Sequence, residues 1–161
     1  MKKLRGLMND CLGLTTTEAI VTCLLISITG SIAVSTYRAW LPGYRLKSAA
    51  RDLYSHMQQS KFMAVKNKTS CRITYSTNPD RYFVSGTTKT VTLQDYGSGV
   101  MFQGPTGQTY SVSTLTFNSR GLSNSGYAYL TNEQKTAFYR VGLSWSTGTP
   151  IIQQYGPGGW N

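Results

Sequence analysis

The stretch Gly13-Leu14-Thr15-Thr16-Thr17-Glu18, followed by AIVTCLLISITGSIAVSTY at residues 19–37, determines how this chain is organised. The nineteen residues of that run carry no charge. As a helix rising about 1.5 Å per residue, the run is roughly 28 Å long, close to the ~30 Å hydrocarbon core of a bilayer. Glu18 lies at its edge, where a carboxylate deep in lipid costs on the order of 2.5–3.5 kcal/mol. The stretch therefore predicts a membrane-spanning helix with a functional carboxylate at one end.

A short basic leader precedes this helix. Its charged residues are Lys2, Lys3, Arg5 and Asp10. By the positive-inside rule, we expect the N-terminus to be cytoplasmic and the rest of the chain to cross the membrane. An ordinary secretory signal places its apolar run before the cleavage site. Here Gly13 precedes the run, so cleavage between Gly13 and Leu14 would leave the span attached to the mature protein.

Gly13-Leu14-Thr15, with Glu18 five residues into the mature chain, resembles the type III signal of type IV pilins and type II secretion pseudopilins. The resemblance implies that a prepilin peptidase cuts after Gly13 and methylates Leu14, the new N-terminal residue. It also implies that Glu18 is the carboxylate used in filament assembly. In lipid, a buried carboxylate and a buried amine are each costly, whereas a pair offsets much of that cost. We therefore hypothesise that Glu18 pairs with the Leu14 amine of a neighbouring subunit; the alternative is a plain signal anchor with an incidental Glu.

The composition indicates one exported, β-rich domain after the span. The chain has 161 residues, of which only 14% are charged, and eleven are Tyr, a residue common on half-buried strand faces. The net charge of +10 becomes +8 without the leader, because 16 − 3 leaves 13 basic and 6 − 1 leaves 5 acidic residues. Such a charge could attract nucleic acid, anionic lipid headgroups or an acidic partner, or could simply be solvated.

The three cysteines predict no structural disulfide. Cys11 lies in the leader, Cys23 in the span and Cys71 in the exported part. We expect Cys71 to be a buried small hydrophobic residue, not a reactive thiol.

A second, amphipathic helical segment is predicted at residues 44–67, after Pro42-Gly43 interrupts or kinks the first helix. Its apolar stripe comprises Leu46, Ala49, Ala50, Leu53, Met57, Ala64 and Val65. The basic residues Arg45, Lys47, Arg51, Lys61, Lys66 and Lys68 should lie largely outside this stripe. His56, the single histidine, is expected at the polar face or its rim, without a catalytic role.

The rest of the chain reads as short strands separated by turns. Strands are predicted at residues 70–75, 81–84, 88–93, 100–102, 113–117, 126–130, 137–143 and 150–154. Turns are predicted at residues 78–80, 118–121 and 132–135. The Gly- and Pro-rich tail at residues 155–161 is expected to be flexible.

Several of these segments resemble the GspH/FimT group of minor pseudopilins and pilins. They are the helix-to-hairpin stretch Ala49–Tyr75, the strand Leu115–Gly121, Gly142-Leu143-Ser144 and Thr147-Gly148-Thr149. The resemblance implies an α+β, pilin-like fold, with a long N-terminal helix packed on an antiparallel β-sandwich or two small sheets. The expected divisions are a leader at residues 1–13, a membrane and assembly helix at 14–41, and a periplasmic domain at 42–161.

The function implied is structural: a minor pilin or pseudopilin at the tip or initiation complex of a type IV pilus or a type II secretion pseudopilus. Its partners would be other minor and major subunits, the prepilin peptidase, an inner-membrane assembly platform and the lipid bilayer. No enzymatic activity or cofactor is expected, since the sequence has no Gly-rich phosphate loop, Gly-x-Ser-x-Gly motif, metal-ligand spacing or suggestive carboxylate pair.

Three alternatives remain. Some relatives of this group capture DNA through basic residues near the C-terminus, but residues 151–161 contain no Lys or Arg here. The available anion or DNA contacts would be Arg120, Lys135 and Arg140, together with the basic helix. Arg38 and Arg45 could instead lie against outer headgroups. A membrane-anchored periplasmic enzyme, binding sugars or peptides in a cleft of Tyr and Trp residues, is the third alternative.

Overall fold

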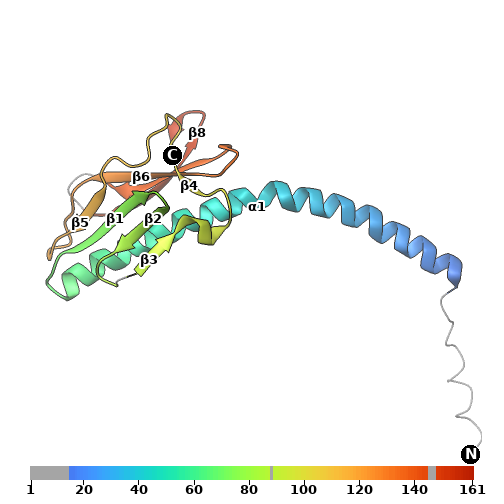
Figure 1. Ribbon diagram of the computed structural model, residues 1–161, viewed down its shortest axis with the longest axis horizontal. Coiled ribbons are helices and arrows are strands. Elements are labelled where there is room, and N and C mark those ends of the chain that lie inside the picture. The colour runs from blue at the N-terminus through green and yellow to red at the C-terminus, as the bar shows by residue number, and fades with distance from the viewer. Residues whose placement is uncertain (1–14, 88, 145–147) are drawn as a thin grey trace, which may run out of the picture. The chain divides into compact units, whose positions relative to one another are not determined.

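The fold begins with one long helix, α1 (Thr16–Lys66), followed by two β-sheets in the computed structural model (Figure 1). The structure describes residues 15–87, 89–144 and 148–161. By internal contacts, the chain divides into two units, Met1–Ala39 and Trp40–Asn161. The part of the first unit that is described is helical from Thr16 onward, and all of the strands belong to the second unit.

The helix is not interrupted at Pro42, contrary to the first of the two sequence-based expectations there. Pro42 lies inside α1, and Gly43 is also helical. A proline within a helix removes one backbone donor, but it ends the helix only if the neighbouring turns have nothing else to hold them. Here Leu46, Ala49 and Ala50 are completely buried within the next two turns, and their packing fixes the helical conformation that follows Pro42.

The apolar stripe of the amphipathic segment packs as predicted, with one exception. Six of its seven residues are fully buried. The seventh, Val65, is 46% exposed, while Ser60 is buried on the stripe. Ser60 can occupy that position because its hydroxyl donates a 2.7 Å hydrogen bond to the carbonyl of His56, one turn earlier. Val65 was therefore wrongly assigned to the core.

Sheet A has the strand order β3-β2-β1-β5 and is antiparallel throughout. Its strands are β1 (Cys71–Thr77), β2 (Asp80–Val84), β3 (Lys89–Thr92) and β5 (Thr114–Phe117). Ile73 in the central strand is paired with Val84 on one side and Leu115 on the other, and all three side chains are fully buried. Leu93, predicted to end a strand, instead begins a short 3-10 helix, η1 (Leu93–Tyr96), and is still buried.

Sheet B has the order β4-β6-β7-β8-β9 and is also antiparallel. Its strands are β4 (Met101–Phe102), β6 (Gly126–Thr131), β7 (Phe138–Leu143), β8 (Pro150–Gly156) and β9 (Gly159–Trp160). The predicted turn at residues 132–135 joins β6 to β7. Asn132 holds this turn through two hydrogen bonds to Thr136, of 2.8 and 2.9 Å.

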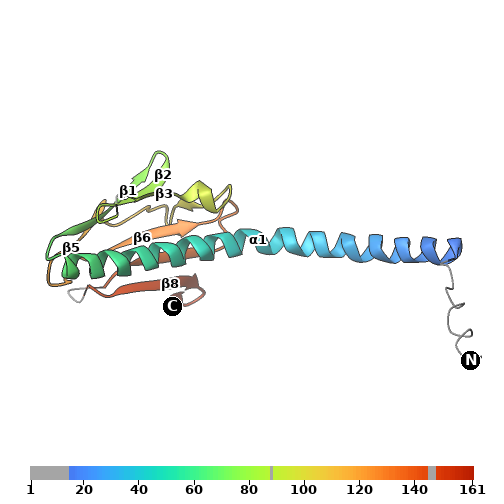
Figure 2. The ribbon, with the colours of Figure 1, turned by 90° about the horizontal axis from the view of Figure 1, so that it is seen from below.

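The helix and both sheets share one core in the second unit. Figures 1 and 2 show the later turns of α1 running beside the strands of both sheets. Leu53 and Met57 of α1, Ile73 of sheet A, and Leu130 and Val141 of sheet B are all fully buried in the same hydrophobic cluster. Cys71, only 3% exposed, also belongs to it, as predicted. The α+β, pilin-like fold class is thus confirmed.

The C-terminal tail was wrongly predicted to be flexible. Strand β8 continues to Gly156, and the tail turns back to form β9, with Gln154 and Asn161 exchanging two backbone hydrogen bonds of 2.8 and 3.0 Å. The Trp160 ring lies 5.6 Å from Tyr129 and 5.2 Å from Tyr155, measured between ring centroids. These contacts hold in place a terminal segment whose Gly and Pro content alone predicted flexibility.

Candidate assembly and binding surfaces

The first turn of α1 carries Glu18, the predicted assembly carboxylate. Thr15 caps this turn: its hydroxyl accepts a 3.3 Å hydrogen bond from the Glu18 backbone N–H, and its carbonyl accepts one from Ala19. Thr-x-x-Glu is the sequence of a capping box, and a carboxylate there also interacts favourably with the helix dipole. The Glu18 side chain is exposed and forms no ion pair with any described residue. The processing residues Gly13 and Leu14 lie outside the described part of the chain.

The helix in the first unit exposes large apolar side chains. Ile20, Leu24, Ile28 and Ile32 are each 56–65% exposed, and no residue of the described helix before Trp40 is buried. Exposed apolar groups of this number are typical of a membrane span or of a helix covered by partners. Among the described residues, α1 is the one helix that meets the length and composition expected of a membrane span.

A row of small residues follows one face of this helix. Ala19, Cys23, Ser27 and Ser31 recur at every fourth position and therefore lie one above another. The two serine hydroxyls donate to carbonyls one turn earlier, at 2.7 and 2.8 Å, so they need no outside partner in lipid. Rows of small residues let membrane helices approach closely. The four-residue spacing is visible in the sequence, but the interpretation there concentrated on hydropathy and missed it.

The three candidate anion contacts are not brought together. Arg120 is exposed in the turn before Gly121, and that turn lies against the last part of α1, with the Cβ position of Gly121 3.1 Å from Val65. Lys135 is exposed in the β6–β7 turn, which lines a pocket with Pro42 and Arg45. At about 1.5 Å per residue, the twenty residues from Arg45 to Val65 separate these two turns by roughly 30 Å.

Arg140 is already engaged within sheet B. Its guanidinium lies 4.8 Å from the centre of the Tyr127 ring and 4.9 Å from that of Trp160, between β6 and β9. Its Nε also donates a 2.8 Å hydrogen bond to Gln153. Stacking of an arginine between two aromatic rings is favourable by roughly 0.5–2 kcal/mol per contact. Arg140 thus fastens the C-terminal hairpin to the sheet.

His56 lies in a polar network between α1 and sheet A, at the edge of the core as predicted. Its Nδ1 is 2.7 Å from the hydroxyl of Tyr82, and its Nε2 is 3.4 Å from Nζ of Lys89. Tyr82 is also hydrogen-bonded to Tyr96. Burial lowers the pKa of His56 below its ordinary value of 6.5, Lys89 lowers it further, and Asp52 partly opposes both.

The other end of this network is a carboxylate. Tyr96 donates a 2.8 Å hydrogen bond to Asp52, and burial, together with that bond, raises the pKa of Tyr96 to about 12. The bonds are consistent with one donor direction: Lys89 donates to His56, His56 to Tyr82, Tyr82 to Tyr96, and Tyr96 to Asp52. In this arrangement His56 is neutral and carries its proton on Nδ1. The network joins the helix to sheet A through these four side chains and the Lys89 ammonium.

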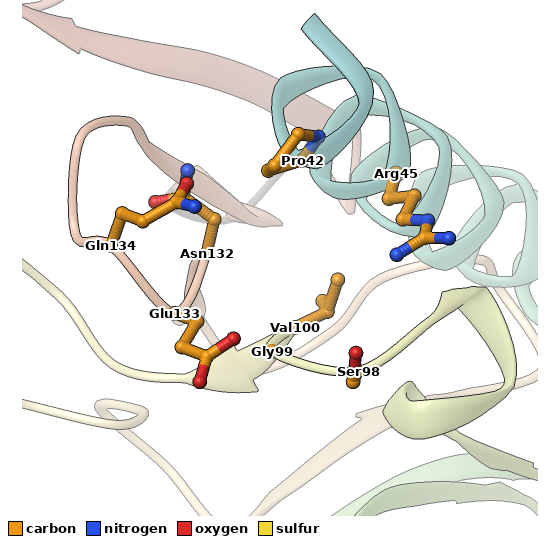
Figure 3. A pocket seen from close by; sticks show the side chains of 8 residues that line it. All are labelled: Pro42, Arg45, Ser98, Gly99, Val100, Asn132, Glu133 and Gln134. Atoms are coloured by element: carbon orange, nitrogen blue, oxygen red, sulfur yellow. The ribbon is translucent and has the colours of Figure 1, made fainter. Parts of the chain in front are cut away.

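A small pocket of about 110 Å³ lies where the β6–β7 turn approaches α1 (Figure 3). Arg45 and Glu133 line it from different sides, together with Pro42, Val100 and Asn132. The volume is well below the 300–1,000 Å³ of most small-molecule sites. In the described ranges, no group of three His, Cys, Asp or Glu side chains could hold a metal ion.

Comparison with known proteins identifies the family. Residues 49–147, more than half of the chain, match the family described as type II transport protein GspH. The chain belongs to the GspH family. It is therefore a type II secretion pseudopilin or pilin, a class of structural subunits. Searches of curated proteins and of solved structures found no match.

The family match in this GspH chain covers α1 from Ala49 onward, all of sheet A, and β4, β6 and β7 of sheet B. It does not cover Glu18, the apolar helix, β8 or β9. Two glycines from segments that suggested the family lie in contact: a Cβ at Gly148 would be 2.2 Å from the carbonyl oxygen of Gly121. Both have positive φ, of +57° and +76°. These glycines allow the backbone at Gly148, just before β8, to lie against the turn after β5.

Proposed function

We propose that this GspH protein is a minor pseudopilin or pilin that is cut after Gly13, methylated on Leu14 and built into the tip or initiation complex of a filament. Residues 1–13 are the leader, residues 14–41 anchor the chain in the inner membrane, and the periplasmic domain follows from residue 42. The observation that carries the proposal is the combination of a GspH domain with an N-terminal helix whose large apolar side chains are exposed.

Two features of α1 support assembly by lateral contact between helices. The row from Ala19 to Ser31 offers a narrow face for close packing in lipid. Glu18 has no ion-pair partner among the described residues of its own chain, so a neighbour's Leu14 amine can supply one. Each charge alone in lipid is costly, and pairing them between subunits makes the correct register of two helices more favourable than a shifted one.

Substitution of Glu18 tests this role. In Glu18→Ala, the leader should still be removed, while incorporation into filaments should fall at least about ten-fold, because the Leu14 amine loses its partner. Incorporation can be measured by immunoblotting of sheared or purified filaments against the membrane pool. Glu133→Ala, which removes an exposed carboxylate from the globular domain, is the matched control. Normal incorporation of Glu18→Ala would refute the pairing role, and a block in leader removal would show that Glu18 acts earlier.

A further inference from the structure

A cationic and aromatic groove lies between the start of the second unit's helix and sheet B. Its volume is about 410 Å³, and it is lined by Trp40, Gly43, Tyr44, Lys47, Arg51, Ala137, Tyr139 and Gln154. None of these residues is acidic. Figure 2 shows β8, which supplies Gln154, running beside the later turns of α1.

The helix supplies the aromatic and charged wall of the groove. Trp40, Tyr44, Lys47 and Arg51 are spaced by four, three and four residues and so share one helix face. The Trp40 and Tyr44 rings are stacked, with centroids 4.8 Å apart, and are 58% and 54% exposed. Lys47 and Arg51 are exposed as well.

The sheet supplies a polar floor. Tyr139 of β7 donates a 3.1 Å hydrogen bond to the side-chain oxygen of Gln154 on the neighbouring strand β8. Burial raises the pKa of the Tyr139 hydroxyl, and this is the larger effect. The nearby Arg51 guanidinium lowers the same pKa. The amide of Gln154 retains its N–H donors for a ligand. Two cations, aromatic rings and amide donors together suit a phosphate attached to an apolar body.

The position of the groove in the sequence indicates where that phosphate comes from. Trp40 follows the end of the uncharged run, Tyr37, by only three residues. Trp and Tyr side chains favour the headgroup level of a bilayer, and cations near it attract anionic lipids. We propose that this groove binds the headgroup of one anionic phospholipid in the outer leaflet of the membrane that anchors the chain. This inference rests on the proposed membrane anchoring.

The test uses the mature full-length chain in nanodiscs of phosphatidylcholine with a minority of phosphatidylglycerol. Native mass spectrometry of the released protein counts the lipids that stay bound. The wild type should retain phosphatidylglycerol in several-fold excess over its share of the bilayer. Lys47→Gln with Arg51→Gln should lose this preference, by roughly five-fold for each charge removed. Lys66→Gln with Lys68→Gln, which removes the same charge at and just beyond the C-terminal end of α1, should keep it.

Three results would overturn the inference. They are an absence of phosphatidylglycerol preference in the wild type, an equal loss of preference in the two double variants, and a preference retained by Lys47→Gln with Arg51→Gln while its filament incorporation falls. The third result would assign the groove to an acidic segment of a neighbouring subunit.

Flotation of each protein with vesicles is measured in parallel. Failure of the wild type to float would contradict the anchoring itself, whereas normal flotation without lipid selectivity would contradict only the groove assignment.

Discussion

His56 makes the stability of the folded domain depend on pH. Its pKa in the folded protein lies below 6.5, because it is partly buried and faces Lys89. In the window between the lowered value and 6.5, the unfolded chain binds more protons than the folded one. The free energy of unfolding therefore falls as the pH drops through 6.5 and levels off below the folded-state pKa of His56.

Replacing His56 isolates this contribution. His56→Gln keeps a polar group near Tyr82 but cannot take up a proton. Between pH 7.5 and pH 5.5, the wild type should lose more stability than the variant, as measured by urea unfolding of the full chain in detergent. Other groups, such as Asp80, whose pKa is raised by burial, titrate equally in both proteins and cancel in the difference. Parallel pH profiles would show that His56 does not titrate in this window.

Two single residues show how far the sequence could predict the candidate site. From its position, Glu18 was predicted to act in assembly, but its place in a Thr-x-x-Glu capping box, equally visible in the sequence, was missed. Arg140 was named as a possible anion contact, without a prediction of what it touches in the fold. Its stacking between Tyr127 and Trp160 depends on the pairing of β6, β7 and the tail, which no local pattern specifies.

Gly142 of β7 lies opposite Tyr127 of β6, where the two backbones leave no room for a side chain. A Cβ at Gly142 would be 2.1 Å from the carbonyl oxygen of Gly126 and 2.7 Å from Cα of Tyr127. Both contacts are with backbone, which cannot move aside without separating the strands. Gly142→Ala should therefore destabilise the domain by about 1–3 kcal/mol or more, as measured by urea unfolding.

Gly158→Ala is the control for this substitution. Gly158 lies in the turn between β8 and β9, and a Cβ there would meet nothing within 4 Å. Its stability should stay within about 0.5 kcal/mol of the wild type. If both variants unfold like the wild type, the close pairing of β6 and β7 at this position is wrong.

Local patterns predicted most elements because strands such as β1 and β5 combine alternating burial with turn residues at their ends. They failed where distant contacts decide the conformation. The tail forms β9 because Trp160 packs against Tyr129 and Arg140, and α1 continues through Pro42 because the following turns are buried. The groove between Lys47 and Gln154 could not be predicted either, since it needs the docking of a helix face on strands about a hundred residues later.

At the scale of the whole molecule, the two units differ in how their apolar side chains are covered. The second has its own hydrophobic core, whereas the described helix of the first buries none of its large apolar side chains. Covering each such side chain is favourable by about 1.5–3 kcal/mol. Lipid can cover them before assembly and sister helices afterwards, which matches a subunit that moves from a membrane into a filament.

We propose that this GspH chain loses its leader yet keeps its apolar helix. The most direct test is the intact mass of the protein extracted from membranes of cells that contain a prepilin peptidase. We predict a mass lower by Met1–Gly13 and higher by one methyl group on Leu14, and the full precursor mass in cells without the peptidase. An unprocessed chain in both strains, or a mature chain beginning after Tyr37, would contradict it.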